Sequence, residues 1–163
     1  MVDTDDGEEL VSRPPVLADL LSICRELNRL GARYVVIGGM AIIQAGFLRA
    51  TEDIDLLVDA SPENFALVRQ ALTVLPDRAV SEVRPSDLDE YIVVRVADEV
   101  VVDLLKSACG VEYASAKGSV DLVDIEGVVI PFANTELLLR LKQTVRDKDR
   151  IDREFLEMKL RPA

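Results

Sequence analysis

Residues 37–59 read IGGMAIIQAGFLRATEDIDLLVD, and this segment shows how the first half of the chain is organised. The apolar run Tyr34–Ile37 leads into it and predicts a short buried strand that ends at a pair of glycines. Residues 40–45 favour a short helix, and residues 54–58 favour a second strand. A strand, a glycine turn, a short helix and another strand are typical of a domain that mixes helices with a sheet.

The rest of the chain predicts further helices and strands on both sides of this segment. Leucines at helical spacing, cap residues and β-branched runs predict helices over 16–30, 62–75, 135–145 and 149–160, and strands over 91–96, 100–105 and two short stretches within 119–132. Ala97-Asp98-Glu99 would form the turn of one hairpin, and Glu126-Gly127 the turn of another. Early alternation followed by hairpins predicts an α/β (α+β) fold, with a mixed sheet flanked by helices.

Composition favours one aliphatic core. The chain has 163 residues, of which 49% are hydrophobic but only 4% aromatic, so Val, Leu and Ile must fill the interior. We expect an acidic, disordered tail over residues 1–12 and a single domain over residues 13–163. Cys24 falls on the apolar face of a predicted helix, whereas Cys109 precedes a glycine and is expected to be a surface thiol.

Charge limits the partners that we expect. A formal net charge of -11 disfavours nonspecific binding to nucleic acid, although a local basic patch near Arg140 to Arg153 is an open alternative. No apolar stretch is long enough for a membrane span, and the acidic N-terminus is unlike a signal peptide. The two cysteines lack metal-ligand spacing, so we expect a reducing, cytoplasmic location.

The absence of histidine limits the chemistry, which must rely on carboxylates, Lys, Arg, hydroxyls or a bound metal. Asp53 and Asp55 are two residues apart on a predicted strand, so both carboxylates point to the same side. Like charges this close repel unless a cation offsets them, and hard oxygen ligands favour Mg²⁺ or Mn²⁺. The alternative for this pair alone is the solvent-exposed end of a strand.

Gly38-Gly39 stands between a strand and a short helix, where backbone N–H groups can approach a phosphate closely. Arg49 and Thr51 lie between these glycines and the aspartates, and a guanidinium or a hydroxyl can bind the same group. Taken alone, the glycines are also compatible with a tight turn, and the two side chains with a surface salt bridge and a turn hydroxyl.

In combination, these features resemble the signature of the polymerase-β nucleotidyltransferase superfamily. The resemblance rests on an apolar strand, Gly38-Gly39, a short helix, Arg49-x-Thr51 and Asp53-x-Asp55 on a strand. Within the superfamily, the chain is similar to the small bacterial branch related to nucleotidyltransferase toxins of abortive-infection systems. The similarity extends from about Val16 to Leu160.

The resemblance implies further site residues. A third carboxylate is expected from a later strand, and Asp103, inside the apolar run 100–105, matches it. An acid in such a run is costly to bury unless it meets a cation or hydrogen bonds, which supports the match. Asp103 could instead face water at a strand end, and Asp98, Asp121 and Asp124 are rival candidates.

The branch also typically has a lysine on a late helix and an Arg-x-Lys-Asp cluster. These match Lys142 and the cluster Arg146 to Asp149, although a salt-bridged, solvated helix pair would show the same pattern.

The resemblance implies transfer of a nucleoside monophosphate from an NTP to an acceptor, with release of pyrophosphate. Asp53 and Asp55 would hold the metal, and Asp103 would complete a second metal site and help to deprotonate the attacking hydroxyl. Gly38, Gly39, Arg49, Thr51 and Lys142 would bind the nucleotide phosphates.

The acceptor would be a protein, a small molecule or an RNA end, and a toxin–antitoxin partner protein fits the same branch. A noncatalytic nucleotide- or partner-binding member of the fold and an unrelated α/β binding module are the alternatives.

Overall fold

A six-stranded mixed sheet organises residues 11–162, which are the residues described by the computed structural model. Its strands are β1 (Tyr34–Ile37), β2 (Asp53–Val58), β3 (Val94–Ala97), β4 (Val101–Leu105), β7 (Val120–Ile125) and β8 (Val128–Ala133). Their order across the sheet is β3-β4-β2-β1-β8-β7. The pairs β2–β4 and β1–β8 are parallel and the other neighbours antiparallel, so the mixed sheet predicted from the sequence is confirmed.

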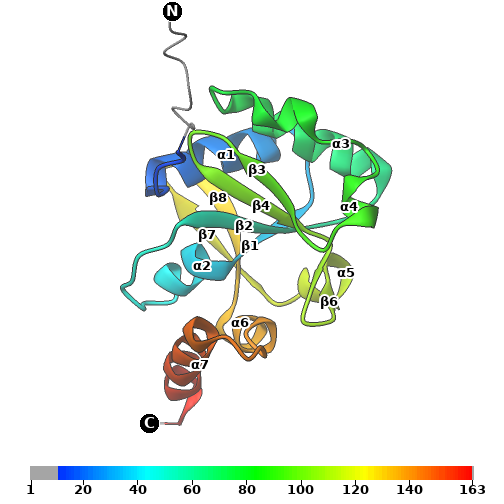
Figure 1. Ribbon diagram of the computed structural model, residues 1–163. Helices are drawn as coiled ribbons and strands as arrows, with labels where there is room; N and C mark the ends of the chain where they lie inside the picture. Colours follow the sequence, from blue (N-terminus) through cyan, green and yellow to red (C-terminus); the bar gives the residue numbers. More distant parts are fainter. Residues whose placement is uncertain (1–10, 163) are drawn as a thin grey trace, which may run out of the picture.

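Helices cover both faces of the sheet (Figure 1). On one side lie α1 (Leu17–Leu30) and α3 (Pro62–Ala71), and on the other α2 (Gly38–Gln44), α6 (Thr135–Leu141) and α7 (Asp147–Leu160). The shorter elements are η1 (Leu72–Val74), η2 (Ala79–Glu82), α4 (Asp87–Glu90), β5 (Ser107–Ala108), β6 (Val111–Glu112) and α5 (Tyr113–Ala116). None of the described helices is both long and apolar enough to cross a membrane.

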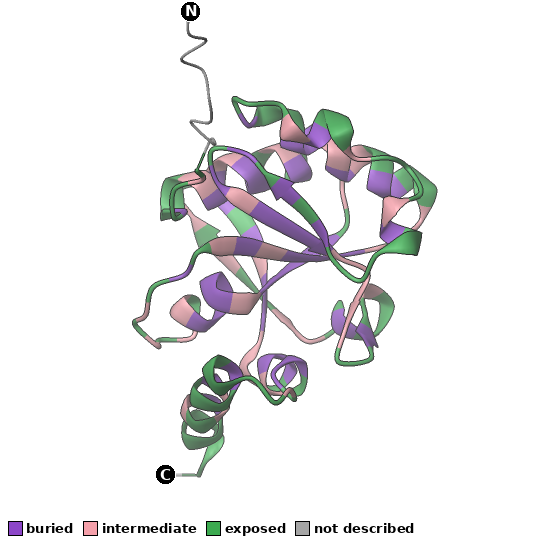
Figure 2. Cartoon of the chain, viewed as in Figure 1, coloured by how far each residue is buried: buried purple, intermediate pink, exposed green. Residues whose placement is uncertain are grey.

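The core is aliphatic, as the composition predicts. Buried residues lie on both faces of the sheet, in α1 and α3 on one side and in α2 and α6 on the other (Figure 2). All four residues of β1 are buried, and Ile54, Leu56 and Val58 of β2 are fully buried. Because side chains alternate along a strand, this burial places Asp53 and Asp55 on the opposite face of β2. The fold therefore directs two acidic side chains toward the side of α2 and α6.

Several element boundaries differ from the sequence prediction; the helix expected over 40–45 begins at Gly38, and the one expected over 149–160 begins at Asp147. The strand expected over 91–96 begins only at Val94, because the Tyr91 N–H bonds to the Asp87 carbonyl and closes α4. The helix expected over 62–75 continues as α3 only to Ala71, and η1 follows it.

The helix expected over 135–145 ends at Leu141. There the Arg153 guanidinium binds the carbonyls of Lys142 and Thr144, which would otherwise continue the helix.

The predicted acidic tail, residues 1–12, lies outside the described residues except for Val11 and Ser12. The Ser12 hydroxyl donates to the carbonyl of Asp98 at 2.6 Å. Both cysteines are free: Cys24 is buried in the core as predicted, and Cys109 is exposed.

Candidate active site

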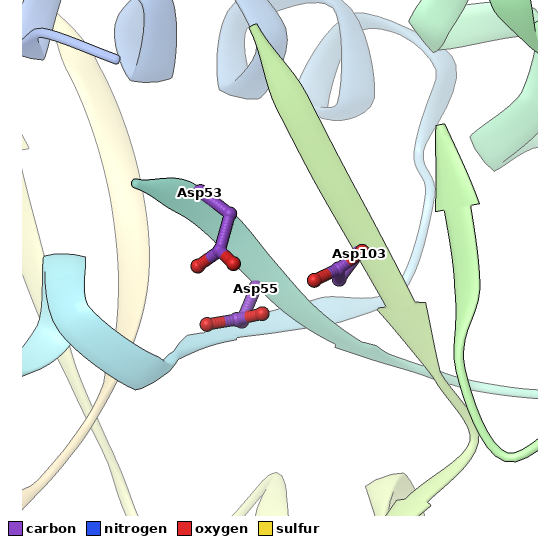
Figure 3. A group of neighbouring side chains, drawn as sticks. All are labelled: Asp53, Asp55 and Asp103. Carbon is purple, nitrogen blue, oxygen red and sulfur yellow. The ribbon is translucent and has the colours of Figure 1, made fainter. Parts of the chain in front are cut away.

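Three carboxylates meet on the sheet face that lies toward α2 and α6 (Figure 3). Asp53 and Asp55 come from β2, and Asp103 comes from the parallel neighbour β4, where it is the register partner of Asp55. One oxygen from each lies within 4.8 Å of the others. The structure thus brings together the three acids that the sequence and the resemblance single out.

The environment of Asp55 indicates that this cluster is short of positive charge. Burial, together with the negative charges of Asp53 and Asp103, raises the pKa of Asp55 to about 7, and the positive charge of Lys142 opposes this shift. A cluster that offers only carboxylate oxygens, with one acid too crowded to ionise readily, fits a hard divalent cation such as Mg²⁺ or Mn²⁺.

The two glycines are required by close packing around these acids. Gly38 has a φ of +67°, and a Cβ built on it would lie 2.8 Å from Cγ of Asp55. A Cβ on Gly39 would lie 2.7 Å from Cβ of Thr51. A side chain at position 38 would therefore collide with Asp55 of β2, and one at position 39 with Thr51, just before β2.

Comparison of two glycines with similar backbone angles tests this packing. We expect Gly31→Ala, at φ +72° with open space around its Cβ, to cost about 1–2 kcal/mol of unfolding free energy through backbone strain alone. Gly38→Ala should cost about 1–3 kcal/mol more, because it also collides with Asp55. Urea unfolding with unchanged m-values measures the difference. Equal losses of unfolding free energy in the two variants would show that the Asp55 side chain can move aside at no cost.

A cavity of about 420 Å³ opens beside the carboxylates. Both acidic and basic side chains line it, together with Gly38 and Gly39: the acids are Asp53, Asp55 and Asp103, and the bases are Arg95, Lys142, Arg146 and Lys148. A cavity of about 560 Å³ lies elsewhere, around Arg33 and Tyr113, but no carboxylate lines it. The chemistry therefore assigns the candidate site to the smaller cavity.

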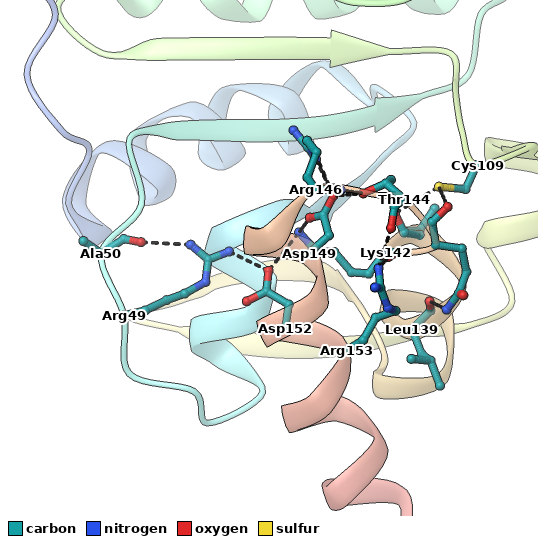
Figure 4. Close-up of polar contacts among 12 residues, drawn as sticks. Arg49, Ala50, Cys109, Leu139, Lys142, Thr144, Arg146, Asp149, Asp152 and Arg153 are labelled. Atoms are coloured by element: carbon teal, nitrogen blue, oxygen red, sulfur yellow. Dashed lines mark hydrogen bonds and ion pairs between the residues drawn. The ribbon is translucent and has the colours of Figure 1, made fainter.

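Lys142 is held by a buried ion-pair network that joins α6 to α7 (Figure 4). Its Nζ lies 3.2 Å from Asp149 Oδ1 and 3.1 Å from Asp152 Oδ2, and both aspartates are fully buried. Asp149 also accepts from Thr144 and Arg146. Although burial opposes the effect, these donors and Lys142 hold the pKa of Asp149 below its usual value. The solvated helix pair that the sequence left open is thus excluded for Lys142, Asp149 and Asp152.

Arg49 and Thr51 lie outside the cavity. Arg49 donates to Asp152 at 3.0 Å and to its neighbour's carbonyl, whereas Thr51 donates to the carbonyl of Asp53 at 3.1 Å. Arg49 thereby ties the segment before β2 to α7, and Thr51 supports the first residue of β2. Their contacts in the structure are to protein groups that hold the site.

The rival acids lie elsewhere. Asp98 is buried in the β3–β4 turn and accepts the backbone N–H groups of Asp77, Ala79 and Glu99. Asp121 and Asp124 are on β7, at the far edge of the sheet from β4.

Arg95 is a site residue that the sequence prediction missed. Its guanidinium donates twice to Asp103, with both contacts at 2.9 Å, and lies 3.6 Å from Asp53. In the structure it is the cross-strand partner of Asp103, a pairing that the turn expected at Ala97-Asp98-Glu99 would not give.

No protein-family model matches the chain, and no curated protein matches its sequence. Among solved structures it is similar to the lincosamide antibiotic adenylyltransferase LnuA in its lincomycin-bound form. The TM-score is 0.56 at 13% identity, over 89% of this chain and 98% of that one. It is also similar to TM1012 of Thermotoga maritima, a protein assigned as a nucleotidyltransferase. Here the TM-score is 0.56 at 17% identity, over 88% of this chain and 90% of that one.

The chain has a nucleotidyltransferase fold. Within this fold, the acid cluster on β2 and β4 and the two glycines that begin α2 lie around one cavity. The relation to the toxin branch stays a prediction from the sequence motifs.

Proposed function

We propose that this chain is a metal-dependent nucleotidyltransferase, which moves a nucleoside monophosphate from an NTP to an acceptor hydroxyl. The observation that carries the proposal is the convergence of Asp53, Asp55 and Asp103 beside a cavity that basic side chains also line. A cavity lined by both acidic and basic side chains suits a metal-bound triphosphate, which presents cationic and anionic groups together.

In this proposal the cluster of Asp53, Asp55 and Asp103 holds Mg²⁺ or Mn²⁺. A bound divalent cation supplies charge stabilisation to the entering and leaving oxygens of the phosphoryl group. The acceptor oxygen forms a bond to the α-phosphorus, the bond from that phosphorus to the pyrophosphate oxygen breaks, and pyrophosphate leaves. Asp103 takes the hydroxyl proton.

The chain's own cations and backbone then bind the phosphates. Lys142 has three N–H donors, of which Asp149 and Asp152 occupy two, so one is left for the cavity that the lysine lines. Gly38 and Gly39 lie at the cavity wall without side chains, which lets a phosphate approach the main chain. We also predicted that Arg49 and Thr51 bind phosphate. In the structure they support the site through hydrogen bonds, Arg49 to the Asp152 carboxylate and Thr51 to the Asp53 carbonyl.

The acceptor belongs to the same proposal. A protein, a small molecule or an RNA end fits the chemistry, and the net charge of -11 disfavours a large nucleic acid. The fold matches 98% of an adenylyltransferase that acts on a lincosamide antibiotic, which supports a small-molecule acceptor. A toxin–antitoxin or defence role with a partner protein, in the cytoplasm, rests on the motif resemblance.

Ligand-induced stabilisation tests the proposal. We expect one NTP with Mg²⁺ to raise the melting temperature of the chain, because a ligand at about 100 times its Kd stabilises the folded state by roughly 2.7 kcal/mol. The shift should require the metal and disappear in the Asp53→Asn/Asp55→Asn variant. The four NTPs, each with Mg²⁺ and with EDTA, give the comparison, and turnover is then followed with labelled nucleotide. The absence of any metal-dependent shift across all four would contradict the proposed function.

A further inference from the structure

A guanidinium lies over the proposed metal ligands. Arg95 is on the edge strand β3, in the same cross-sheet row as Asp103 and Asp55. From there it crosses β4 to reach Asp53 on β2. Its side chain is 59% exposed, whereas those of Asp103 and Asp53 are 7% and 21% exposed. The guanidinium therefore lies between these carboxylates and solvent.

We propose that Arg95 is the resident counter-cation of the acid cluster, and that it competes with a divalent cation for Asp103 and Asp53. This inference rests on the proposed function, since it assumes that the cluster is a metal site. It assigns Arg95 a gating role: the guanidinium holds the carboxylates together before loading and must withdraw from Asp103 as a metal ion binds.

The geometry favours competition over a supporting role. Both oxygens of Asp103 accept a hydrogen bond from the Arg95 guanidinium, one from Nε and one from Nη2. Neither carboxylate oxygen is therefore without a contact to the arginine. The same guanidinium is 3.6 Å from Asp53, and so takes up the space between the two acids. A divalent ion bound there would need these oxygens and would meet a like charge at close range.

No other cation among residues 11–162 makes an ion pair with the cluster. Lys142 and Arg146 also line the cavity, but they are paired with Asp149, and Lys142 also with Asp152. Arg95 is thus the side chain whose removal changes the charge at the carboxylates without disturbing the buried network.

The fold allows Arg95 to leave. Its side-chain hydrogen bonds among the described residues go to Asp103 alone. On its outer side, β3 pairs with no further strand of the described sheet. A half-exposed side chain on an edge strand can swing into solvent without opening the core. Withdrawal therefore costs the chain the ion pairs of Arg95 with Asp103 and Asp53.

Manganese binding to the nucleotide-free full chain tests the inference, with the free ion followed by electron paramagnetic resonance. We expect Arg95→Gln to lower the Kd for Mn²⁺ by about tenfold, since a competing charge and its hydrogen bonds are removed. Arg84→Gln is the matched control, because it removes one exposed arginine for which the structure shows no ion pair. This control should bind Mn²⁺ within about twofold of wild type, as expected for a screened surface charge.

The possible outcomes separate the inference from the proposed function. Equal or weaker Mn²⁺ binding by Arg95→Gln, with wild type still binding the ion, would overturn the gating role and leave the metal site in place. Failure of wild type and both variants to bind Mn²⁺, even with an NTP present, would contradict the proposed function itself and the inference with it. Circular dichroism of Arg95→Gln confirms that the variant is folded.

Discussion

Asp55→Asn is expected to stabilise the metal-free protein and to abolish nucleotidyl transfer. Asp55 is half-buried beside two other carboxylates, and this environment raises its pKa to about 7. The neutral amide keeps the shape of the side chain and removes a charge that the fold accommodates poorly. We expect unfolding at pH 8 to require about 1–3 kcal/mol more free energy in the variant. Transfer should fall by at least about a thousandfold, because a metal ligand is lost.

The stabilisation by Asp55→Asn should depend on pH in a defined direction. A folded pKa above the ordinary value of 3.8 means that the native state keeps its proton while the unfolded chain releases it. Wild-type stability from this group is therefore fully present below pH 3.8 and is lost as the pH rises through about 7. The difference in melting temperature between variant and wild type should grow over the same range.

Melting curves in EDTA at pH 5 and at pH 8 measure this difference. Asp121→Asn is the control, since Asp121 is an exposed acid on the edge strand β7 and should leave the curves unchanged. Melting of Asp55→Asn at or below the wild-type temperature at pH 8 would show that the cluster places no strain on the fold. Full retention of transfer would remove Asp55 from the proposed chemistry.

Local pattern in the sequence was sufficient to predict the mixed sheet and the Asp53–Asp55 pair, whereas Asp103 was expected from the resemblance to the superfamily. Strand alternation alone placed Asp53 and Asp55 on one side of β2 and Ile54 and Leu56 on the other. The apolar run around Asp103 indicated an acid that needs a cation, and the parallel pairing of β2 with β4 supplies the other two carboxylates.

Arg95 was missed because its position depends on the register of one hairpin. The expected turn at Ala97-Asp98-Glu99 would have paired Arg95 with Val101 instead of Asp103. In the structure Ala97 pairs with Val101, so the turn lies one residue further along the chain. Burial of Asp98, which binds three backbone N–H groups, accompanies this register. These long-range contacts to the η2 segment have no signature in the local sequence.

The burial of Asp149 and Asp152 is likewise a tertiary effect. Two acids three residues apart in a strongly charged helix are typical of a solvated surface. Here the same spacing directs both toward Lys142, and Arg49 from the segment before β2 completes the set. Only the packing of α7 against α6 and that segment turns a polar helix face into an interior one.

Lys142→Met is expected to destabilise the fold by about 3 kcal/mol, because it leaves two buried aspartates without their shared cation. The methionine retains the aliphatic part of the side chain, so the loss reports on charge. The value is at the lower end for a broken buried ion pair, since Asp149 keeps Arg146 and Asp152 keeps Arg49. Urea unfolding of the variant and of wild type, in the absence of nucleotide, gives the difference.

A compensating substitution separates this structural role of Lys142 from phosphate binding. Asp149→Asn added to Lys142→Met removes one uncompensated charge, while Arg146 can turn to solvent because its side chain is 68% exposed. We expect the double variant to recover at least about half of the lost stability. Transfer should remain about 100- to 1,000-fold below wild type, because the donor at the cavity is still missing. Asp149→Asn alone is the control for the added change. If transfer returns together with stability, Lys142 acts only by joining α6 to α7. The phosphate contact must then come from Arg146 or Lys148, which line the same cavity.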